Sequence, residues 1–331
     1  MSKAIPYIDM HCDTLMHGVG KKAEDIFSMP DAMVDLERLS KAGVYAQFFA
    51  VFFPPKEGME KSLGTTDDDA YFSAAHTLLK NTISRHGDLL AFAGNAVDAE
   101  KNHAQGKVSA FLTMEDGRAV QGSFDRLRYF YNQGVRLISL TWNFENCFGA
   151  PNSKDPAMMN KGLTAFGKEA VGAMNEMGII VDVSHLSDGG FWDVVNLTRK
   201  PFVASHSNCR ALTPHTRNLT DEMIRALAEK GGVAGLNFAP EFLWTEADAA
   251  AGSKISRIER MCAHLSHLID VGGEDCAAIG TDFDGIGGEL EVGTPTEMEK
   301  LFEALSRHGF SDRLIEKIAY QNTLRVIRET M

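Results

Sequence analysis

The sequence has 331 residues, of which 44% are hydrophobic and 24% are charged, and its formal net charge at pH 7 is −12. This composition predicts a folded globular protein and excludes a disordered chain, since it supplies enough apolar material for a large core. The acidic balance also argues against a dedicated nucleic-acid surface or a surface for anionic membranes, because both need clustered lysine and arginine.

Strand-sized apolar runs follow one another along the chain. There are eight, at residues 7–10, 44–51, 109–114, 135–140, 179–183, 202–205, 232–237 and 276–281. They are rich in β-branched or aromatic residues and almost continuously apolar, as expected for parallel strands covered on both faces. Helical spacing of apolar residues lies between them, for example at 70–85, 162–177, 221–230 and 255–271. This alternation predicts an α/β fold, a (β/α)8 or TIM barrel, in one domain spanning residues 1–331.

Glycines and irregular segments mark the connections. Gly134, Gly178 and Gly231 end predicted helices just before a strand, which is typical of a left-handed helix cap. The main irregular segments are 17–40 and 147–160, and each follows a predicted strand end. In a barrel such loops lie at the C-terminal face, where active sites are built.

Histidine and carboxylate side chains collect where the predicted strands end. They are His11, Asp13, Glu115, His185, His206, Asp282 and Asp284. Because the carboxyl ends of barrel strands converge on one mouth, we expect these side chains to lie together. His11 and Asp13 are two residues apart, which places both side chains on the same side of an extended chain.

These residue types are ligands that zinc accepts, and a carboxylate can bridge two cations through its two oxygens. We predict one site from His11, Asp13 and Glu115. A second site takes Glu115, His185 and His206, so that Glu115 bridges two zinc ions. Such a pair of metals holds a shared water whose pKa falls toward neutrality, giving a bridging hydroxide, while one metal polarises the scissile carbonyl.

The carboxylates after the last strand predict the proton transfer. Asp282 is expected to act as general base and acid, taking the proton of the hydroxide and passing it to the leaving amine. Asp284 is the alternative, since it lies two residues further on. The pattern therefore predicts hydrolysis of an amide bond without a protein nucleophile.

The cysteines and the N-terminus bear on the compartment. Five scattered cysteines, with no C-x-x-C pair, predict neither a disulfide framework nor a thiolate zinc site. The N-terminal segment has no long apolar stretch, and no apolar run approaches the roughly 20 residues that span a bilayer. We expect a cytoplasmic protein without a membrane partner, which acts on a small molecule.

Segments from one end of the chain to the other carry a family resemblance. They read IDMHCD, LTMEDG, ISLTWN, VDVSHLSD, PFVASHSNCRALTPHTRNLTDE, GGVAGLNF, AIGTDFDGI and QNTLRVIRE. Together they resemble the membrane dipeptidase (renal dipeptidase) family of the amidohydrolase superfamily, in a bacterial-type member. The resemblance implies a zinc-dependent dipeptidase with two metals on the ligands predicted above.

The resemblance also implies residues that contact the substrate. The family's catalytic aspartate falls on Asp282, and its substrate-binding arginine falls on Arg217, whose planar fork suits the free carboxylate of a dipeptide. The alternative for Arg217 is a surface ion pair with Asp221 or Glu222 in the following helix. The other expected substrate contacts are Trp142, Asn143, Asn237 and Asp284.

Two positions depart from the animal members of that family. Trp142 stands where they have a substrate-contacting histidine, and Ala239 stands where they have a tyrosine. Because both departures fall in the substrate pocket, the alternative function is an amidohydrolase that acts on N-acyl amino acids or lactams. A third hypothesis is a barrel that binds a small molecule or a partner without catalysis. A homodimer is the default oligomer, since two-fold dimers are common among soluble enzymes.

Overall fold

A closed ring of parallel strands forms the centre of the protein. The computed structural model describes residues 5–252 and 254–331. In this part of the chain eight strands form the ring, in the order β1 (Ile8–Cys12), β2 (Ala46–Phe52), β4 (Val108–Glu115), β5 (Val135–Ser139), β6 (Ile180–Asp182), β7 (Val203–Ala204), β8 (Val233–Leu236) and β10 (Ala277–Ile279). The ring closes because β1 pairs with both β2 and β10. Each predicted strand is present, and the (β/α)8 barrel is confirmed.

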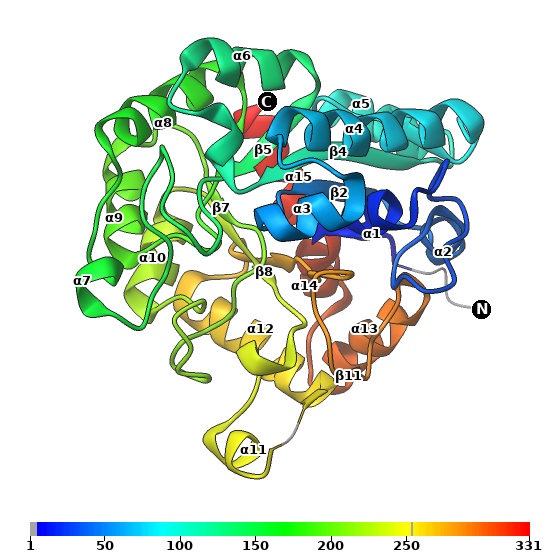
Figure 1. The fold of residues 1–331 in the computed structure, drawn as a ribbon. Helices are drawn as coiled ribbons and strands as arrows, with labels where there is room; N and C mark the ends of the chain where they lie inside the picture. The colour runs from blue at the N-terminus through cyan, green and yellow to red at the C-terminus, as the bar shows by residue number, and fades with distance from the viewer. Residues whose placement is uncertain (1–4, 253) are drawn as a thin grey trace.

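Helices surround the ring (Figure 1). They are α1 (Thr14–Lys21), α2 (Leu36–Ala42), α3 (Lys56–Leu63), α4 (Asp68–Arg85), α5 (Ala96–Ala104), α6 (Phe124–Asn132), α7 (Pro156–Met159), α8 (Ala165–Met177), α9 (Asp188–Leu197), α10 (Asp221–Glu229), α11 (Glu246–Ala250), α12 (Ile258–Gly272), α13 (Met298–Arg307), α14 (Asp312–Glu316) and α15 (Asn322–Thr330). Short 3-10 turns lie at Gly117–Val120, Pro240–Phe242 and Pro295–Glu297, and a π-helical turn at Lys317–Gln321 joins α14 to α15.

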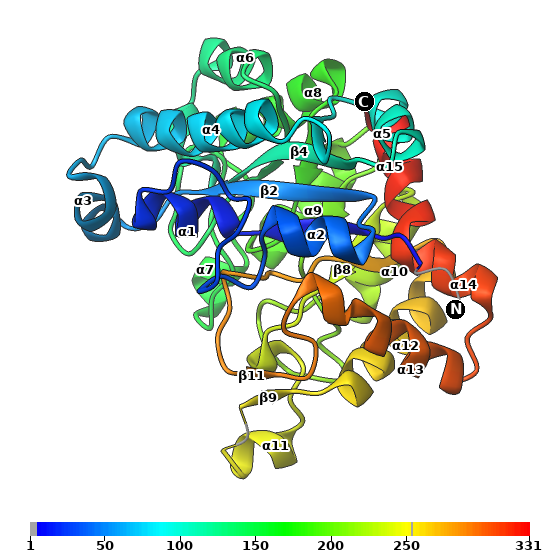
Figure 2. The same cartoon turned by 90° about the vertical axis from the view of Figure 1, so that its right-hand side faces the viewer.

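Apolar side chains fill the inside of the barrel. The rings of Phe48 and Phe111 stack there with their centroids 4.6 Å apart. Leu324 and Ile327 of α15 belong to the same buried cluster, so this helix closes one end of the barrel. Figure 2 places α15 and α3 at opposite ends, and α3 follows the carboxyl end of β2. The open mouth is therefore the end where the strands finish.

Short elements inside predicted loops are the main difference from the sequence prediction. The irregular segment 17–40 contains the end of α1 and the start of α2, and the segment 147–160 contains α7. Asp35 caps α2 by accepting from the Arg38 main-chain N–H, and Asp155 caps α7 in the same way through Ala157. These caps begin helices that the apolar pattern alone did not reveal.

Two strand segments also depart from the prediction. The predicted helix 255–271 begins only at Ile258, because Ile255–Ser256 forms β9 and pairs with β11 (Glu289–Leu290). The short strand β3 (Leu90–Phe92) pairs with β4 outside the ring and was not predicted. The left-handed glycines were predicted correctly, with φ of 99° at Gly134, 77° at Gly178 and 73° at Gly231.

The ends of the chain and its helices bear on the membrane question. Among the residues that the structure describes, no helix combines the length and the apolar character needed to cross a bilayer. Residues 1–4, which begin the N-terminal segment without a long apolar stretch, lie outside the described residues.

Candidate metal centre at the barrel mouth

The strand ends bring six of the predicted side chains together. Glu115 is the last residue of β4, and the others lie in or just after β1, β6, β7 and β10. They are His11, Asp13, Glu115, His185, His206 and Asp282. Five of them are buried, and the His185 side chain is 11% exposed.

Glu115 lies between two groups of ligand atoms. Its Oε2 is 3.4 Å from His11 Nε2. Its Oε1 is 2.9 Å from His185 Nε2 and 3.6 Å from His206 Nε2. Since the two oxygens face different histidines, the carboxylate has the placement that bridging two cations requires.

The second group surrounds His11. Its Nε2 is 3.6 Å from Asp13 Oδ2 and 3.8 Å from Asp282 Oδ1, so Asp282 also lies within reach of a cation held here. A Cβ atom on Gly285 would lie 2.1 Å from Asp13 Oδ2 and 2.7 Å from Asp282 Oδ1. Glycine at this position therefore leaves the room that the two carboxylates occupy.

Outer hydrogen bonds indicate which nitrogen of His206 and of His185 carries the proton. Ser205 Oγ donates to Asp182 Oδ2 at 2.6 Å, so it must accept from His206 Nδ1, 2.7 Å away. His185 Nδ1 is 3.3 Å from the acceptor Oδ1 of Asn143. Both Nε2 atoms are thus left with lone pairs that point into the mouth, as metal ligands need.

Unpartnered polar atoms indicate that these residues fit a cation. Both ring nitrogens of His11 and Oδ1 of Asp13 are buried and have no hydrogen-bond partner among the described residues. Burial without a partner costs free energy, and bound metal would relieve that cost. Burial also raises the pKa of Asp13 to about 6 and that of Asp282 to about 7, because negative charge is disfavoured there.

The central carboxylate and two histidines have the protonation states that ligands need. Burial opposes ionisation of Glu115, but the adjacent histidines, above all His11, outweigh it and hold the pKa of Glu115 well below its usual range. Burial lowers the pKa of His185 to about 4 and holds that of His206 well below its usual value. At neutral pH these groups are an ionised carboxylate and two neutral imidazoles.

Left-handed backbone aims several of these side chains. His185 has φ of 68° and Asp282 has φ of 63°, and such values are uncommon for residues other than glycine. Each residue lies in the turn that leaves a barrel strand. Strained backbone of this kind concentrates at functional sites, where the surrounding structure holds it in place.

Two predicted substrate contacts bond to the protein itself. Asn237 Nδ2 donates to Asp282 Oδ2 at 2.8 Å, so this amide orients the carboxylate. Asp284 accepts from Thr14 Oγ1 at 2.6 Å and from the main-chain N–H groups of Met33 at 2.6 Å and Val34 at 3.3 Å. Asp284 therefore holds the 29–35 loop against the barrel, and its direct contact with a substrate stays a prediction.

Arg217 is buried beside the histidines. It donates from Nη1 to Ser207 Oγ at 3.1 Å and from Nη2 to the His206 carbonyl at 3.2 Å, while its Nε has no partner. Among the described residues it makes no ion pair, and the alternative partner Asp221 bonds to His267 instead, at 2.7 Å. A buried guanidinium without a carboxylate leaves room for one from a ligand.

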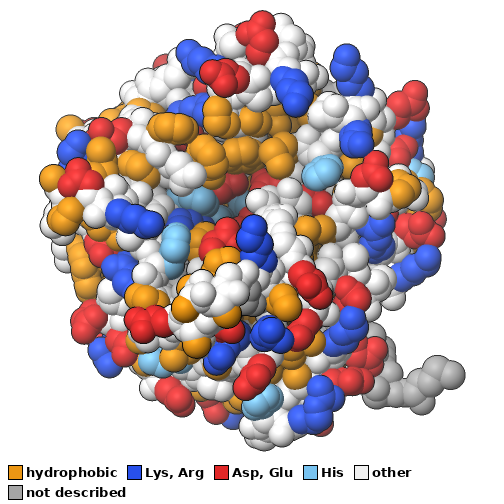
Figure 3. All heavy atoms as spheres, turned by 60° about the horizontal axis from the view of Figure 1, so that its bottom comes forward, with side chains coloured by type: hydrophobic (Ala, Val, Ile, Leu, Met, Phe, Trp, Pro, Cys, Tyr) orange, Lys and Arg blue, Asp and Glu red, His pale blue; other side chains and the backbone are white. Residues whose placement is uncertain are grey.

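The mouth opens into a cavity of about 210 Å³ above the cluster. Glu115, His185 and Asp282 border it on the polar side. Trp142 borders it on an aromatic side, with its ring centroid 4.9 Å from that of Phe52 and 5.8 Å from that of the exposed Phe144. Figure 3 shows a hollow with histidine side chains in it and a band of hydrophobic side chains along one rim.

Asp182 and Ser205 are the positioning residues that sequence reasoning missed. Asp182 also accepts the main-chain N–H groups of Ser184 at 2.9 Å and Ser205 at 2.8 Å, so one carboxylate ties the ends of β6 and β7 together. A charged residue inside the apolar run 179–183 was the available signal, because a buried carboxylate needs donors.

The comparison with protein families assigns the chain. The family model described as membrane dipeptidase (Peptidase family M19) matches residues 1–331. The chain belongs to this family. Its membership makes the chain a metallo-dipeptidase, a hydrolase of peptide bonds, and argues against the hypothesis of a barrel without catalysis.

Known relatives and structures agree with this assignment. A Klebsiella pneumoniae protein described as uncharacterised, in the pqqA 5′ region, is 34% identical over 76% of this chain and 93% of its own length. A crystal structure described as the dipeptidase AC, a metallo peptidase of family M19, is 30% identical over 99% of both chains, with a TM-score of 0.87. A metallo peptidase from Rhodobacter sphaeroides, liganded with a phosphinate mimic of L-Ala-D-Ala, is 28% identical over 99% of this chain and 100% of its own, with a TM-score of 0.86.

Proposed function

We propose that the chain hydrolyses the amide bond of dipeptides with two zinc ions bound at the barrel mouth. The observation that carries this proposal is a convergence of lone pairs. The Nε2 atoms of His185 and His206 lie 3.0 Å apart, and Glu115 Oε1 lies 2.9 Å from the first and 3.6 Å from the second. The outer hydrogen bond to Ser205 leaves the His206 Nε2 lone pair free, and Glu115 is ionised at neutral pH, so a cation among these atoms would be attracted to both residues.

The ligand sets follow from the side of Glu115 on which each residue lies. His11 and Asp13 would hold one zinc with Oε2, and His185 and His206 would hold the other with Oε1. Bound there, the two ions would supply a water acidified toward neutral pH and a Lewis acid for the scissile carbonyl.

Asp282 is the residue proposed to move the proton. Its Oδ1 lies 3.8 Å from His11 Nε2, so the carboxylate reaches the place where the attacking water would be held and can accept a proton from it. It would take a proton from the attacking water and deliver it to the leaving amine. Asn237 holds the other oxygen in place through its 2.8 Å hydrogen bond.

Arg217 is proposed to bind the free carboxylate of the dipeptide. Its guanidinium is next to His185 and His206, and it has no acidic partner within the described chain. Two parallel charge-assisted hydrogen bonds would fix the carboxylate at a set distance from the metals. This distance would admit one residue beyond the scissile bond and exclude longer peptides.

Kinetics on paired substrates test this role. Arg217→Ala is expected to lower kcat/KM for L-Ala-D-Ala and L-Ala-L-Ala by about a hundredfold, the value of one or two charge-assisted bonds, and to lower it far less for the dipeptide amides. Arg225→Ala, which changes an exposed arginine of α10, is the matched control. Equal losses on the free dipeptides and the amides would refute the assignment.

The substrate's amine separates dipeptides from the alternative N-acyl amino acids. Glu241 borders the mouth cavity and is exposed, so it offers a negative charge to the ammonium of a dipeptide. An N-acyl amino acid has the same carboxylate but no ammonium. We therefore expect the zinc-loaded protein to prefer Ala-Ala over N-acetylalanine, and Glu241→Gln to reduce that preference.

A further inference from the structure

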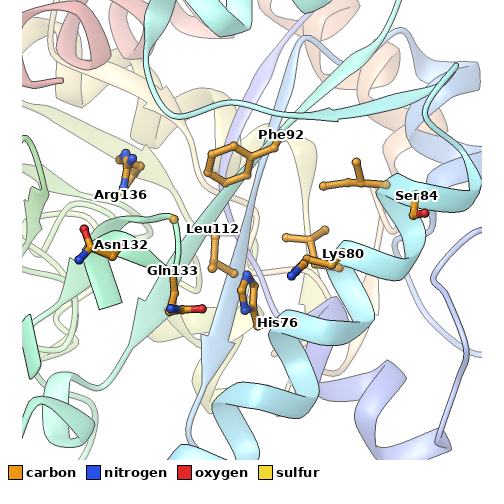
Figure 4. Close-up of a pocket in the computed structure, with 11 residues that line it drawn as sticks. His76, Lys80, Ser84, Phe92, Leu112, Asn132, Gln133 and Arg136 are labelled. Atoms are coloured by element: carbon orange, nitrogen blue, oxygen red, sulfur yellow. The ribbon is translucent and has the colours of Figure 1, made fainter. Parts of the chain in front are cut away.

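A second cavity lies outside the barrel, where β4 changes partners. Residues Val108–Ala110 of β4 pair with β3, and residues Leu112–Glu115 pair with β5. The pairing with β5 shifts register between Leu112 and Thr113. The two neighbouring strands therefore diverge and leave a cavity of about 430 Å³ beside α4, which we call the fork pocket (Figure 4).

The floor of the fork pocket is apolar. Leu79 and Ile83 of α4 line it together with Leu112 and Phe92. Leu112 is only 1% exposed, so the cavity reaches the outer wall of the barrel. The Phe92 ring forms one wall against Gly134, where a Cβ atom would lie 2.9 Å from the ring and where φ is 99°. Cavities of roughly 300–1,000 Å³ with apolar linings are typical of small-molecule sites.

The rim of the fork pocket is cationic. Lys80 reaches toward the cavity from α4, and Arg136 lies on the opposite side (Figure 4). Lys80 makes no ion pair within the described residues. The Arg136 guanidinium donates to the main-chain carbonyls of Gly94 at 3.0 Å, Tyr131 at 2.9 Å and Val135 at 3.0 Å, and to no carboxylate.

No residue that lines the fork pocket is acidic. Arg136 lies near the Asp98 carboxylate and interacts with it electrostatically, so among the described lining residues Lys80 is the cation left without an acidic partner. Such a cation beside an apolar floor favours a ligand that brings its own negative charge and apolar surface together. A free amino acid fits poorly, since no acidic side chain of the lining would meet its ammonium. An inorganic anion would leave the apolar floor uncovered.

We propose that the fork pocket binds a small organic carboxylate with an apolar body, which lies on Leu112 and Phe92 with its carboxylate toward Lys80. The site is separate from the metal centre, because the two cavities share no lining residue. It thus provides the dipeptidase with a second ligand of different chemistry from its substrate.

Calorimetric titration of the zinc-loaded protein with octanoate tests this proposal. Octanoate is expected to bind at one saturable site, and the neutral octanamide of equal length is expected to bind about tenfold more weakly, as the loss of one charge-assisted hydrogen bond predicts. Acetate should show no binding at the same concentrations. Binding of octanamide as strong as that of octanoate would overturn the ionic part of the proposal.

Variants locate the binding. Lys80→Gln changes an exposed side chain and should weaken octanoate binding about tenfold, whereas Lys101→Gln, the same change on an exposed lysine of α5, should leave it unchanged. Ser84→Phe, at an exposed position of the rim, should reduce binding by filling the cavity. Octanoate that binds Lys80→Gln and Ser84→Phe as well as the parent protein lies elsewhere, for example at the metals, and would refute the proposal.

Discussion

The two sides of Glu115 are held in different ways. On one side, His206 is fixed by Ser205 and Asp182, and His185 is fixed by Asn143. On the other side, neither ring nitrogen of His11 has a hydrogen-bond partner among the described residues. Hydrogen bonds set the first pair of imidazoles, whereas His11 is held by burial and by contact with the His206 ring, whose centroid is 3.9 Å from its own. Preorganisation at this mouth is therefore unequal.

The largest effect is expected from removing the residue that the two sides share. Glu115→Gln keeps the shape but loses the charge, so both metals should bind more weakly. We expect kcat/KM to fall by about a thousandfold or more, because several kcal/mol of transition-state stabilisation depend on the metals. Metal analysis of the purified variant checks this. Glu145→Gln, at an exposed ion pair with Lys161, is the control, and two tightly bound metals in Glu115→Gln would contradict the bridge.

Asp282→Asn tests the less organised side. If Asp282 moves the proton, the variant should keep both metals and lose about a hundredfold in kcat. Loss of one metal would instead make Asp282 a ligand beside His11, which its 3.8 Å distance allows.

Asp284→Asn should mainly lower stability, because that carboxylate holds the 29–35 loop. If this variant lost more turnover than Asp282→Asn, Asp284 would be the residue that moves the proton.

Ser205→Ala sharpens the comparison on the organised side. It removes the acceptor of His206 Nδ1 and one donor to Asp182, so the proton on the imidazole is no longer fixed. Loss of an outer hydrogen bond typically weakens metal binding by about ten- to a hundredfold. Titration with zinc should show one site weakened and the other unchanged. The control Ser73→Ala, on the surface of α4, should weaken neither site. Equal weakening of both sites would remove the distinction drawn here.

Stability, and not metal binding or turnover, is expected to change at the loop that carries Arg217. His264 lies beneath this loop, where its Nδ1 accepts from the Cys209 main-chain N–H at 3.1 Å. Burial lowers its pKa to about 3, so between about pH 3 and 6.5 the unfolded chain binds a proton that the folded chain excludes. The neutral His264 therefore costs no stability above pH 6.5, and the free energy of unfolding falls as the pH drops below that value.

Denaturant unfolding at several pH values checks the role of His264. In that window the free energy of unfolding should rise with pH by up to about 1.4 kcal/mol per unit from this one proton. His264→Gln should remove this part of the slope, while His308→Gln, at an exposed histidine after α13, should not. An unchanged slope in His264→Gln would show that the ring is not held neutral.

The barrel, and the gathering of histidine and carboxylate side chains at its mouth, could be predicted because both leave local signals. Strands buried on two faces are almost continuously apolar, so a histidine or carboxylate directly after one of them, such as His185, stands out. The outer hydrogen bonds left little signal. Ser205 and Asp182 are far apart in the chain, and a serine next to a strand end looks like any other.

Packing across elements explains the remaining differences. The roles of Asn237 and Asp284 depend on which donors and acceptors the fold brings near them, and no local pattern encodes these partners. β3 is only three residues long and forms because β4 leaves one edge open below its shift in register. Such tertiary effects override local propensity, which is why this strand was missed.

Closure of the ring between β1 and β10 has a consequence for how the protein matures. The first barrel strand can find its second neighbour only after nearly the whole chain has been synthesised, and the Asp282 main-chain N–H bonds to the His11 carbonyl across that seam. Until then β1 keeps an unpaired edge, which is open to wrong partners. A ribosome-bound chain that stops before β10 would contain all four strand ends that carry the predicted metal ligands, yet it would lack Asp282. Activity should therefore appear late in synthesis and all at once.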